Sequence, residues 1–465
     1  MKTSISYTDI FKLSIPIMIG SAVQNLITLT DTIFLGRVGE IELGAIGLVG
    51  VFYLMIASIG YSFSKAGQIM IARRMGAQEL EKIGTIYYSM LAFALSLALL
   101  LFLFMQFGGD YFFALFVNNK DIYTACIAYL DYRSAGIFFS YAGVIIVALY
   151  TGVARTQVII YNALVLGIAN TILNYGLIFG KWGLPEMGIA GAGLASTIAE
   201  GLAFLIFIVY ILLDKKNRAY GLFGTPNATH SQTAVLDEAI NLPKRKFPSI
   251  NVDIIKAQLK LSTPIVLQSV VGMGSWFIFF IIIEDMGKTE LAISNIMRAV
   301  YLLFMIPCWG FASSINTLAS NLIGKNKMDE VFTVTTKTAI LSFGVTMICA
   351  VSMLIAPEVV LRVGTDNLDL IQQSVRLTGV LTGILALFSI GAIYFNGLVG
   401  TGATNQALFF QVICVIFYLI YIYVVVHLLG CSLETAWMAE FYYWIISLVT
   451  SIWYLRSNRW KNIQV

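Results

Sequence analysis

Long apolar stretches, separated by short charged or Gly/Pro-containing breaks, run along almost the whole chain. Twelve of them are long enough to cross a membrane, since a spanning helix needs about 20 mostly apolar residues. Those in the first half lie near residues 11–35, 44–71, 86–108, 134–154, 158–180 and 188–213. Those in the second half lie near residues 260–283, 291–319, 333–355, 377–400, 405–429 and 433–456. Because a helix satisfies its own backbone polar groups, which lipid cannot do, the pattern predicts an all-α integral membrane protein with twelve transmembrane helices.

The two halves of the chain repeat each other at a constant offset of 248 residues. Lys12-Leu13-Ser14-Ile15-Pro16 returns as Lys260-Leu261-Ser262-Thr263-Pro264. The further matches at this offset are Gly39 with Gly287, Glu42 with Glu290, Tyr53 with Tyr301, Gly76 with Gly324, Gly152 with Gly400 and Thr156 with Thr404. Since each half has six spans, both begin on the same side of the membrane and form parallel repeats.

This repeat predicts two parallel six-helix lobes around a central cleft. We expect the N-terminal lobe at residues 1–213 and the C-terminal lobe at residues 259–465, joined by a polar cytoplasmic linker at residues 214–258. Two lobes that rock against each other can expose a cleft to each side of the membrane in turn. The architecture therefore favours a transporter over a channel.

The composition and the placement of charge agree with this prediction. Hydrophobic residues make up 58% of the chain and charged residues only 12%, against about 25% charged residues in a typical soluble domain. With the N-terminus in the cytoplasm, inside segments hold 20 basic residues and outside segments hold 7, Arg133 among them. The positive-inside rule then places both termini in the cytoplasm of a multi-pass protein of the inner (plasma) membrane. The net charge of +4 gives no reason to expect a nucleic-acid partner.

The sequence carries no signature of an enzyme. We find no HExxH, GxSxG or nucleotide-binding loop, and the two histidines, His230 and His427, are isolated. The five cysteines are scattered, without a CxxC pair, so a disulfide framework or a zinc site is not expected. We expect no cofactor beyond a coupling ion, a small-molecule substrate, contact with membrane lipid and function as a monomer.

Several short motifs stand out along the chain: Pro16, Gln24, the run Asp31-Thr32-Ile33-Phe34-Leu35-Gly36-Arg37-Val38-Gly39, the turn Ala72-Arg73-Arg74-Met75-Gly76-Ala77 and the turn Gly400-Thr401-Gly402-Ala403-Thr404. Together they resemble the motifs of the MATE (multidrug and toxic compound extrusion) family. The resemblance covers essentially the whole chain. It implies efflux of organic, often cationic, compounds by antiport driven by H+ or Na+. The alternative is a flippase for lipid-linked saccharides or another lipid-like substrate, as in related families of the same superfamily.

Asp31 is the first candidate for ion coupling. A carboxylate near the centre of a span costs about 2.5–3.5 kcal/mol on insertion scales, so it should face a cavity or a partner. Gln24, Thr28, Asp31 and Leu35 fall at helical spacing and predict a polar stripe. Desolvation disfavours the charged carboxylate and a bound cation favours it, so either a proton or Na+ can be linked to conformation. Hydration of Asp31 near the outer surface is the competing interpretation.

Other polar residues extend the N-lobe candidate site. Asn170 and Asn174 lie one turn apart in the fifth span, where they could coordinate an ion, hold Asp31, or make ordinary interhelical hydrogen bonds. The family's ion site commonly has an aspartate where Asn174 stands. Thr197, which matches a family threonine, and Glu200 lie three residues apart in the sixth span. The resemblance implies a possible Na+ site at Asp31, Asn170 and Thr197, and leaves the choice between H+ and Na+ open.

The C-terminal lobe differs from the N-terminal one. Phe279 stands at the repeat position of Asp31, so no matching carboxylate is expected there. Glu440 in the last span is as suited to a structural pairing as to transport. Lys65 is expected to extend toward the cytoplasmic interface, and Arg298 to pair with Glu284 or Glu290 near the outer surface.

Overall fold

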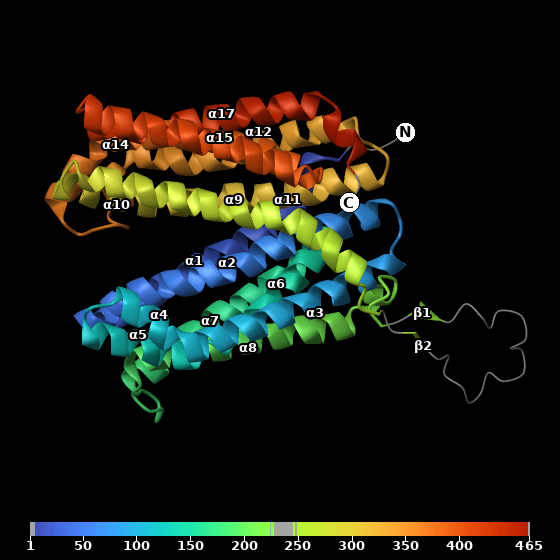
Figure 1. Cartoon of the computed structure of the whole chain (residues 1–465), viewed down its shortest axis with the longest axis horizontal. Helices are drawn as coiled ribbons and strands as arrows, with labels where there is room; N and C mark the ends of the chain where they lie inside the picture. Colours follow the sequence, from blue (N-terminus) through green and yellow to red (C-terminus); the bar gives the residue numbers. More distant parts are fainter. Residues whose placement is uncertain (1–4, 224, 227–244, 247–248, 464–465) are drawn as a thin grey trace, which may run out of the picture. The chain divides into compact units, whose positions relative to one another are not determined.

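The computed structural model describes residues 5–223, 225–226, 245–246 and 249–463, and helices dominate it (Figure 1). The helices of the first half are α1 (Tyr7–Val38), α2 (Glu40–Gly76), α3 (Glu81–Leu103), α4 (Gly109–Phe116), α5 (Lys120–Arg133), α6 (Gly136–Gly152), α7 (Gln157–Phe179) and α8 (Gly188–Leu213). Those of the second half are α9 (Val252–Glu284), α10 (Lys288–Phe304), α11 (Ile306–Gly324), α12 (Glu330–Ile355), α13 (Pro357–Leu361), α14 (Leu368–Gly400), α15 (Thr404–Tyr423), α16 (Leu433–Trp437) and α17 (Ala439–Arg456). Short π-helical turns occupy Phe104–Gly108 and Val424–Leu428, and 3-10 turns occupy Lys215–Arg218 and Arg459–Asn462.

The predicted linker begins as a folded extension of α8. Asp214 pairs with Arg155, and the hydroxyl of Tyr88 donates to the carbonyl of Leu222 at 2.9 Å. Two-residue strands, β1 (Thr225–Pro226) and β2 (Arg245–Lys246), pair antiparallel. Residues 227–244 lie outside the described part of the chain.

Nine of the described helical segments are long and apolar enough to cross a membrane, and eleven do so if each bent pair counts as one span. The bent pairs are α5 with α6, at 55°, and α10 with α11, at 46°. Pro307 stands in the first turn of α11, where its missing amide hydrogen and its ring favour a new helix start over continuation of α10. In the other bent pair, α5 begins at Lys120, so the predicted fourth span at residues 134–154 covers only the second helix of that pair.

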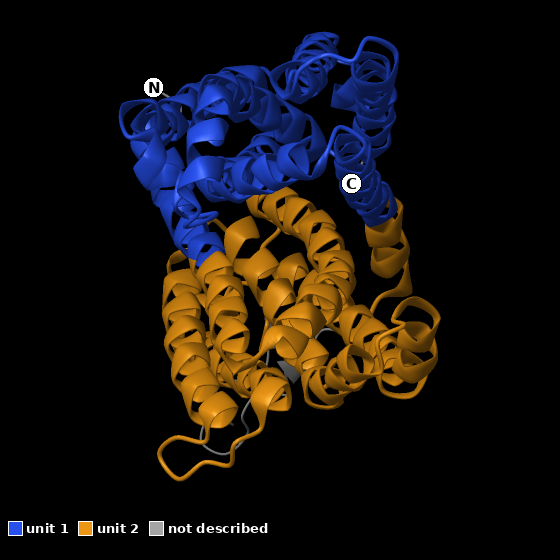
Figure 2. Cartoon of the chain, turned by 90° about the vertical axis from the view of Figure 1, so that its left-hand side faces the viewer, with its two compact units in different colours: residues 1–22, 261–465 blue, residues 23–260 orange. Residues whose placement is uncertain are grey.

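The chain folds into two compact units, shown in Figure 2. Unit 1 comprises residues 1–22 and 261–465, and unit 2 comprises residues 23–260. The division falls inside α1 and α9, so each unit takes the start of one helix from the other half of the chain. In unit 1 the first turns of α1 pack on α11, where the Ser14 hydroxyl donates to that of Ser314 at 2.8 Å.

The backbone repeats at the offset found in the sequence. Gly39 and Gly287 precede α2 and α10, and their carbonyls accept from the amides of Leu43 and Leu291 at 3.1 Å in both cases. Positive φ angles recur in pairs 248 residues apart, at Gln78 and Asn326, at Ala154 and Gly402, and at Trp182 and Gly430. L-residues rarely adopt this conformation, so the coincidence shows that equivalent turns follow equivalent helices in both halves.

Glycines at the start of α8 bring three helices of unit 2 close together. A Cβ atom at Gly191 would lie 2.6 Å from the carbonyl oxygen of Leu177 in α7. One at Gly193 would lie 2.6 Å from the carbonyl oxygen of Tyr129 in α5. Because the backbones themselves are in contact, polar side chains on α5, α7 and α8 are held within reach of one another.

Candidate functional site

Asp31 lies on the buried face of the part of α1 that belongs to unit 2. Its side chain is only 8% exposed, and Ile27 and Leu35, one turn before and one turn after, are buried as well. Gln24 and Thr28 are exposed, so the predicted polar stripe divides into an exposed part and the buried Asp31. The Thr28 hydroxyl donates to the backbone carbonyl of Gln24 at 3.2 Å instead of facing the carboxylate.

A chain of hydrogen bonds connects Asp31 to two further helices. The amide nitrogen Nδ2 of Asn174 donates to Asp31 Oδ1 at 2.5 Å and to Asn170 Oδ1 at 2.9 Å. Asn170 Nδ2 donates in turn to the hydroxyl of Ser196 at 3.0 Å. The two asparagines, on α7, are fully buried, and Ser196 lies on α8. Ser196, one residue before the predicted Thr197, carried no distinguishing signal in the sequence.

The charge of Asp31 lacks a basic partner within this group. No lysine, arginine or histidine forms an ion pair with it in the described part of the chain. The side-chain oxygen Oδ1 of Asn174 is also buried without a hydrogen-bond partner among the described residues. A buried charge is costly unless it is compensated. The arrangement therefore suits a carboxyl group that takes up either a proton or a cation.

A second buried group of unit 2 is a complete ion pair. Arg133, at the end of α5, donates from Nη1 to Glu200 Oε2 at 2.8 Å and from Nη2 to Glu200 Oε1 at 2.5 Å. The guanidinium also lies 3.9 Å from the ring centroid of Tyr53. Arg133 is buried in unit 2 and ends the first helix of the broken pair α5 and α6, so it is not an exposed loop residue. Its predicted place on the outer side of the membrane stays a prediction. Glu200, which the sequence gives as a candidate for the N-lobe site, has this arginine as its counter-charge.

Thr197 belongs to the surroundings of the ion pair. Its hydroxyl donates to the carbonyl oxygen of Tyr132 at 2.8 Å. A Cβ atom at Gly136 would come within 3.0 Å of both Thr197 Oγ1 and Glu200 Oε2 and would collide with Arg133 Nη1. Glycine at the start of α6 thus leaves the space that the guanidinium occupies.

Of the residues proposed for Na+, the structure joins Asp31 and Asn170 through Asn174, whereas Thr197 is engaged elsewhere. The oxygens available near Asp31 are its own carboxylate, Asn174 Oδ1 and Asn170 Oδ1. Oxygen ligands of this kind suit hard cations. No cluster of three or more His, Cys, Asp or Glu side chains suited to a metal ion occurs among the described residues.

Unit 1 has no carboxylate at the repeat position of Asp31. Phe279, at the repeat position of Asp31, is buried against the rings of Trp437 and Tyr418, with centroids 5.4 and 5.9 Å away. Arg298 lies 4.8 Å from the ring centroid of Phe280, and no ion pair joins it to Glu284 or Glu290 in the described structure. Lys65 is half-buried in α2.

The sequence matches the family model MatE twice, over residues 16–176 and 264–424. The two matches are themselves displaced by 248 residues, as the repeat predicts. A curated relative, the probable multidrug resistance protein NorM of Synechocystis sp., is 24% identical over 307 residues, or 64% of this chain and 60% of that protein. A second protein of that name, from Thermotoga maritima, is 23% identical over 403 residues, or 85% of this chain and 80% of its own. The chain thus spans less than two thirds of the first of these relatives.

Solved structures share the fold. The outward-facing conformation of a multidrug resistance MATE family transporter of the MOP superfamily superimposes with a TM-score of 0.85, at 19% identity, over 97% of this chain and 96% of that one. A MOP superfamily transporter from Pyrococcus furiosus, described as having a binding pocket of reverse polarity that suggests a different function, gives a TM-score of 0.84 at 19% identity over 98% and 97%. These superpositions confirm the all-helical, two-lobed membrane fold predicted from the sequence.

Proposed function

Because the chain belongs to the MATE family, we propose that it exports organic, often cationic, compounds as a secondary active transporter. Entry of H+ or Na+ drives the export by antiport, and the substrate site opens to the two sides of the membrane alternately. We further propose that the protein lies in the inner membrane with both termini in the cytoplasm, which is the orientation favoured by its basic residues. The curated relatives are named as probable multidrug resistance proteins, which supports this class of substrate.

The observation that carries the proposal is the lone charge of Asp31. Arg133 and Glu200 both act on Asp31 through space, with opposite signs, and they neutralise each other in their own ion pair. In this proposal Asp31 is the group whose charge is removed by a proton or compensated by Na+. An ion that binds one conformation of the protein more tightly than another shifts the balance between them. Uptake of the ion at Asp31 can therefore be linked to release of substrate.

A saccharide-lipid flippase is less well supported by the same residues. Substrates of that class carry phosphate groups, which call for free guanidinium or ammonium groups. The buried guanidinium of Arg133 is already satisfied by two bonds to Glu200. We therefore favour the organic-cation exporter.

Efflux measured in membrane vesicles with a pH gradient or an Na+ gradient imposed separately tests the proposal. Asp31→Asn keeps the shape and removes the charge, so we expect ethidium transport to fall to the level of vesicles without the protein. Asp131→Asn is the matched control, because Asp131 is exposed in the same unit and should leave transport unchanged. Normal efflux by Asp31→Asn under both gradients would show that another residue couples the ion.

A further inference from the structure

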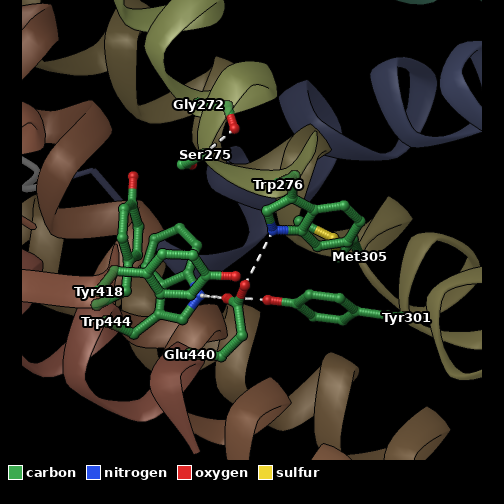
Figure 3. Close-up of a pocket in the computed structure, with 9 residues that line it drawn as sticks. Gly272, Ser275, Trp276, Tyr301, Met305, Tyr418, Glu440 and Trp444 are labelled. Carbon is green, nitrogen blue, oxygen red and sulfur yellow. Dashed lines mark hydrogen bonds between the residues drawn. The ribbon is translucent and has the colours of Figure 1, made fainter. Parts of the chain in front are cut away.

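Unit 1 contains a cavity of about 110 Å³ whose walls are aromatic (Figure 3). Five rings border it, from four helices: Trp276 on α9, Tyr301 on α10, Tyr418 on α15, and Tyr443 and Trp444 on α17. The carboxylate of Glu440, near the start of α17, lies among them. Trp276, Tyr443 and Trp444 are half-buried, so the cavity is not sealed from its surroundings.

Glu440 is held in place by neutral donors alone. It is only 4% exposed. The indole Nε1 of Trp276 donates to its Oε1 at 2.9 Å, and that of Trp444 donates to its Oε2 at 3.2 Å. No basic side chain forms an ion pair with it anywhere in the described part of the chain. The carboxylate is thus oriented but not neutralised, and a buried negative charge in this state favours a positively charged ligand.

The lining distinguishes an organic cation from a metal ion. Hard metal ions require several oxygen ligands, and Glu440 is the one carboxylate among the residues that line this cavity. The groups that donate to it are indole nitrogens, which are donors only and cannot coordinate a metal ion. Around an organic ammonium group, by contrast, aromatic rings are favourable neighbours, and cages of such rings recognise quaternary ammonium ligands. The walls are packed as a unit: the rings of Trp276 and Tyr301 stack at 5.7 Å, and those of Tyr443 and Trp444 meet edge to face at 4.9 Å.

The volume sets the size of the ligand. A cavity of about 110 Å³ compares with about 30 Å³ per molecule of liquid water and with about 300–1,000 Å³ for pockets that enclose a drug-sized molecule. A compact ammonium head group fits, and a multi-ring drug does not.

We propose that this cavity binds the alkylammonium group of a small organic cation, with Glu440 as its counter-charge and the five rings as its walls. The proposal rests on the proposed export of organic cations and adds a binding site for them. The lining residues belong to unit 1, whereas Asp31, the proposed ion-coupling residue, belongs to unit 2. The site could not be found from the repeat, because Glu440 lies outside the motifs that the two halves share.

Calorimetric titration of the purified full-length protein with choline tests the proposal. Its neutral isostere 3,3-dimethylbutan-1-ol is the matched ligand. We expect choline to bind the wild-type protein more tightly than the alcohol, because only choline carries a positive charge. Glu440→Gln removes the counter-charge of choline and should weaken choline binding by about tenfold or more. Glu358→Gln is the control variant, because Glu358 is exposed in the same unit. Equal affinity for choline and the alcohol, or unchanged choline binding by Glu440→Gln, overturns the proposal.

A second variant keeps the test valid if Glu440→Gln fails to fold. Tyr443→Leu leaves the charge in place and removes one aromatic wall, so choline binding should weaken while binding of the alcohol is maintained. Choline affinity that is unaffected by this change contradicts the proposal. The outcome is also separable from that for the exporter. If the protein shows gradient-driven efflux but its choline binding does not depend on Glu440, only the proposed binding site is refuted. If choline binding depends on Glu440 but no gradient-driven efflux occurs, only the proposed export is refuted.

Discussion

Removing either member of the Arg133–Glu200 pair should destabilise unit 2 more than removing both. The side chains are 7% and 14% exposed and share two hydrogen bonds of 2.8 and 2.5 Å. Breaking one partner of a buried pair costs about 3–5 kcal/mol, because the remaining charge stays buried, whereas replacing both by apolar residues can be nearly neutral. We expect Arg133→Met and Glu200→Leu each to lower the free energy of unfolding by about 3–5 kcal/mol. The double variant should lose less than either single one.

Denaturant titration of the purified protein in detergent, followed by tryptophan fluorescence, measures these changes as a double-mutant cycle. The pair Glu79–Lys82 is the control, since it belongs to the same unit and has an N–O distance of 2.7 Å with side chains 33% and 62% exposed. Exposed pairs of this kind couple by about 0.2–1 kcal/mol. If the losses of the two single variants simply add in the double variant, or if the coupling is no larger than that of Glu79–Lys82, the reasoning is refuted.

Transport gives this prediction a second readout. In Glu200→Leu the charge of Arg133 is no longer compensated, and its through-space effect on Asp31 should then compete with that of the coupling ion. Efflux should therefore fail even in vesicles where the variant is folded. The double variant removes the competing charge and should recover efflux, an outcome that a purely structural role for the pair does not predict.

Two further changes are expected to have defined effects. Gly193→Ala should lower the free energy of unfolding by about 1–3 kcal/mol, because its Cβ would lie 2.6 Å from the Tyr129 carbonyl oxygen. Gly344→Ala, whose Cβ meets nothing within 4 Å, should raise the free energy of unfolding by about 0.5–1 kcal/mol. Equal effects of the two variants in denaturant titrations would contradict this account. Asn174→Asp places a second carboxylate beside Asp31, and two such neighbours cannot both ionise without a cation. Na+ should then raise the midpoint of thermal unfolding more in this variant than in the wild-type protein, whereas equal shifts would count against an ion site here.

Part of the candidate site follows from spacing within single helices. Asn170 and Asn174 must share a face of α7, because residues four apart do so in any α-helix. The same rule groups Gln24 with Asp31, but it cannot show where the buried face of α1 ends. In the structure Gln24 is exposed and Asp31 is buried. The hydrogen bond from Asn174 to Asp31 joins residues 143 positions apart, and no periodicity within one helix can predict it.

The breaks in the helices mark another limit of sequence reasoning. Hydropathy locates apolar stretches well but does not register the bend of 55° between α5 and α6. Because Arg133 stands one residue before the apolar stretch, its position predicts a loop residue, whereas it is buried at the end of α5. Burial of a guanidinium becomes acceptable only when a carboxylate elsewhere in the fold compensates it.

The amino-acid sequence by itself determined the membrane class, the helical spans and the parallel repeat, because these depend on the order of apolar residues and on a fixed offset along one chain. Tertiary structure alone decided which charges are compensated. Arg133 reaches Glu200 across 67 residues, and Trp276 reaches Glu440 across 164. Such pairs depend on how helices pack side by side, and the electrostatic state of a buried group is set by its neighbours in space rather than by its neighbours in the chain.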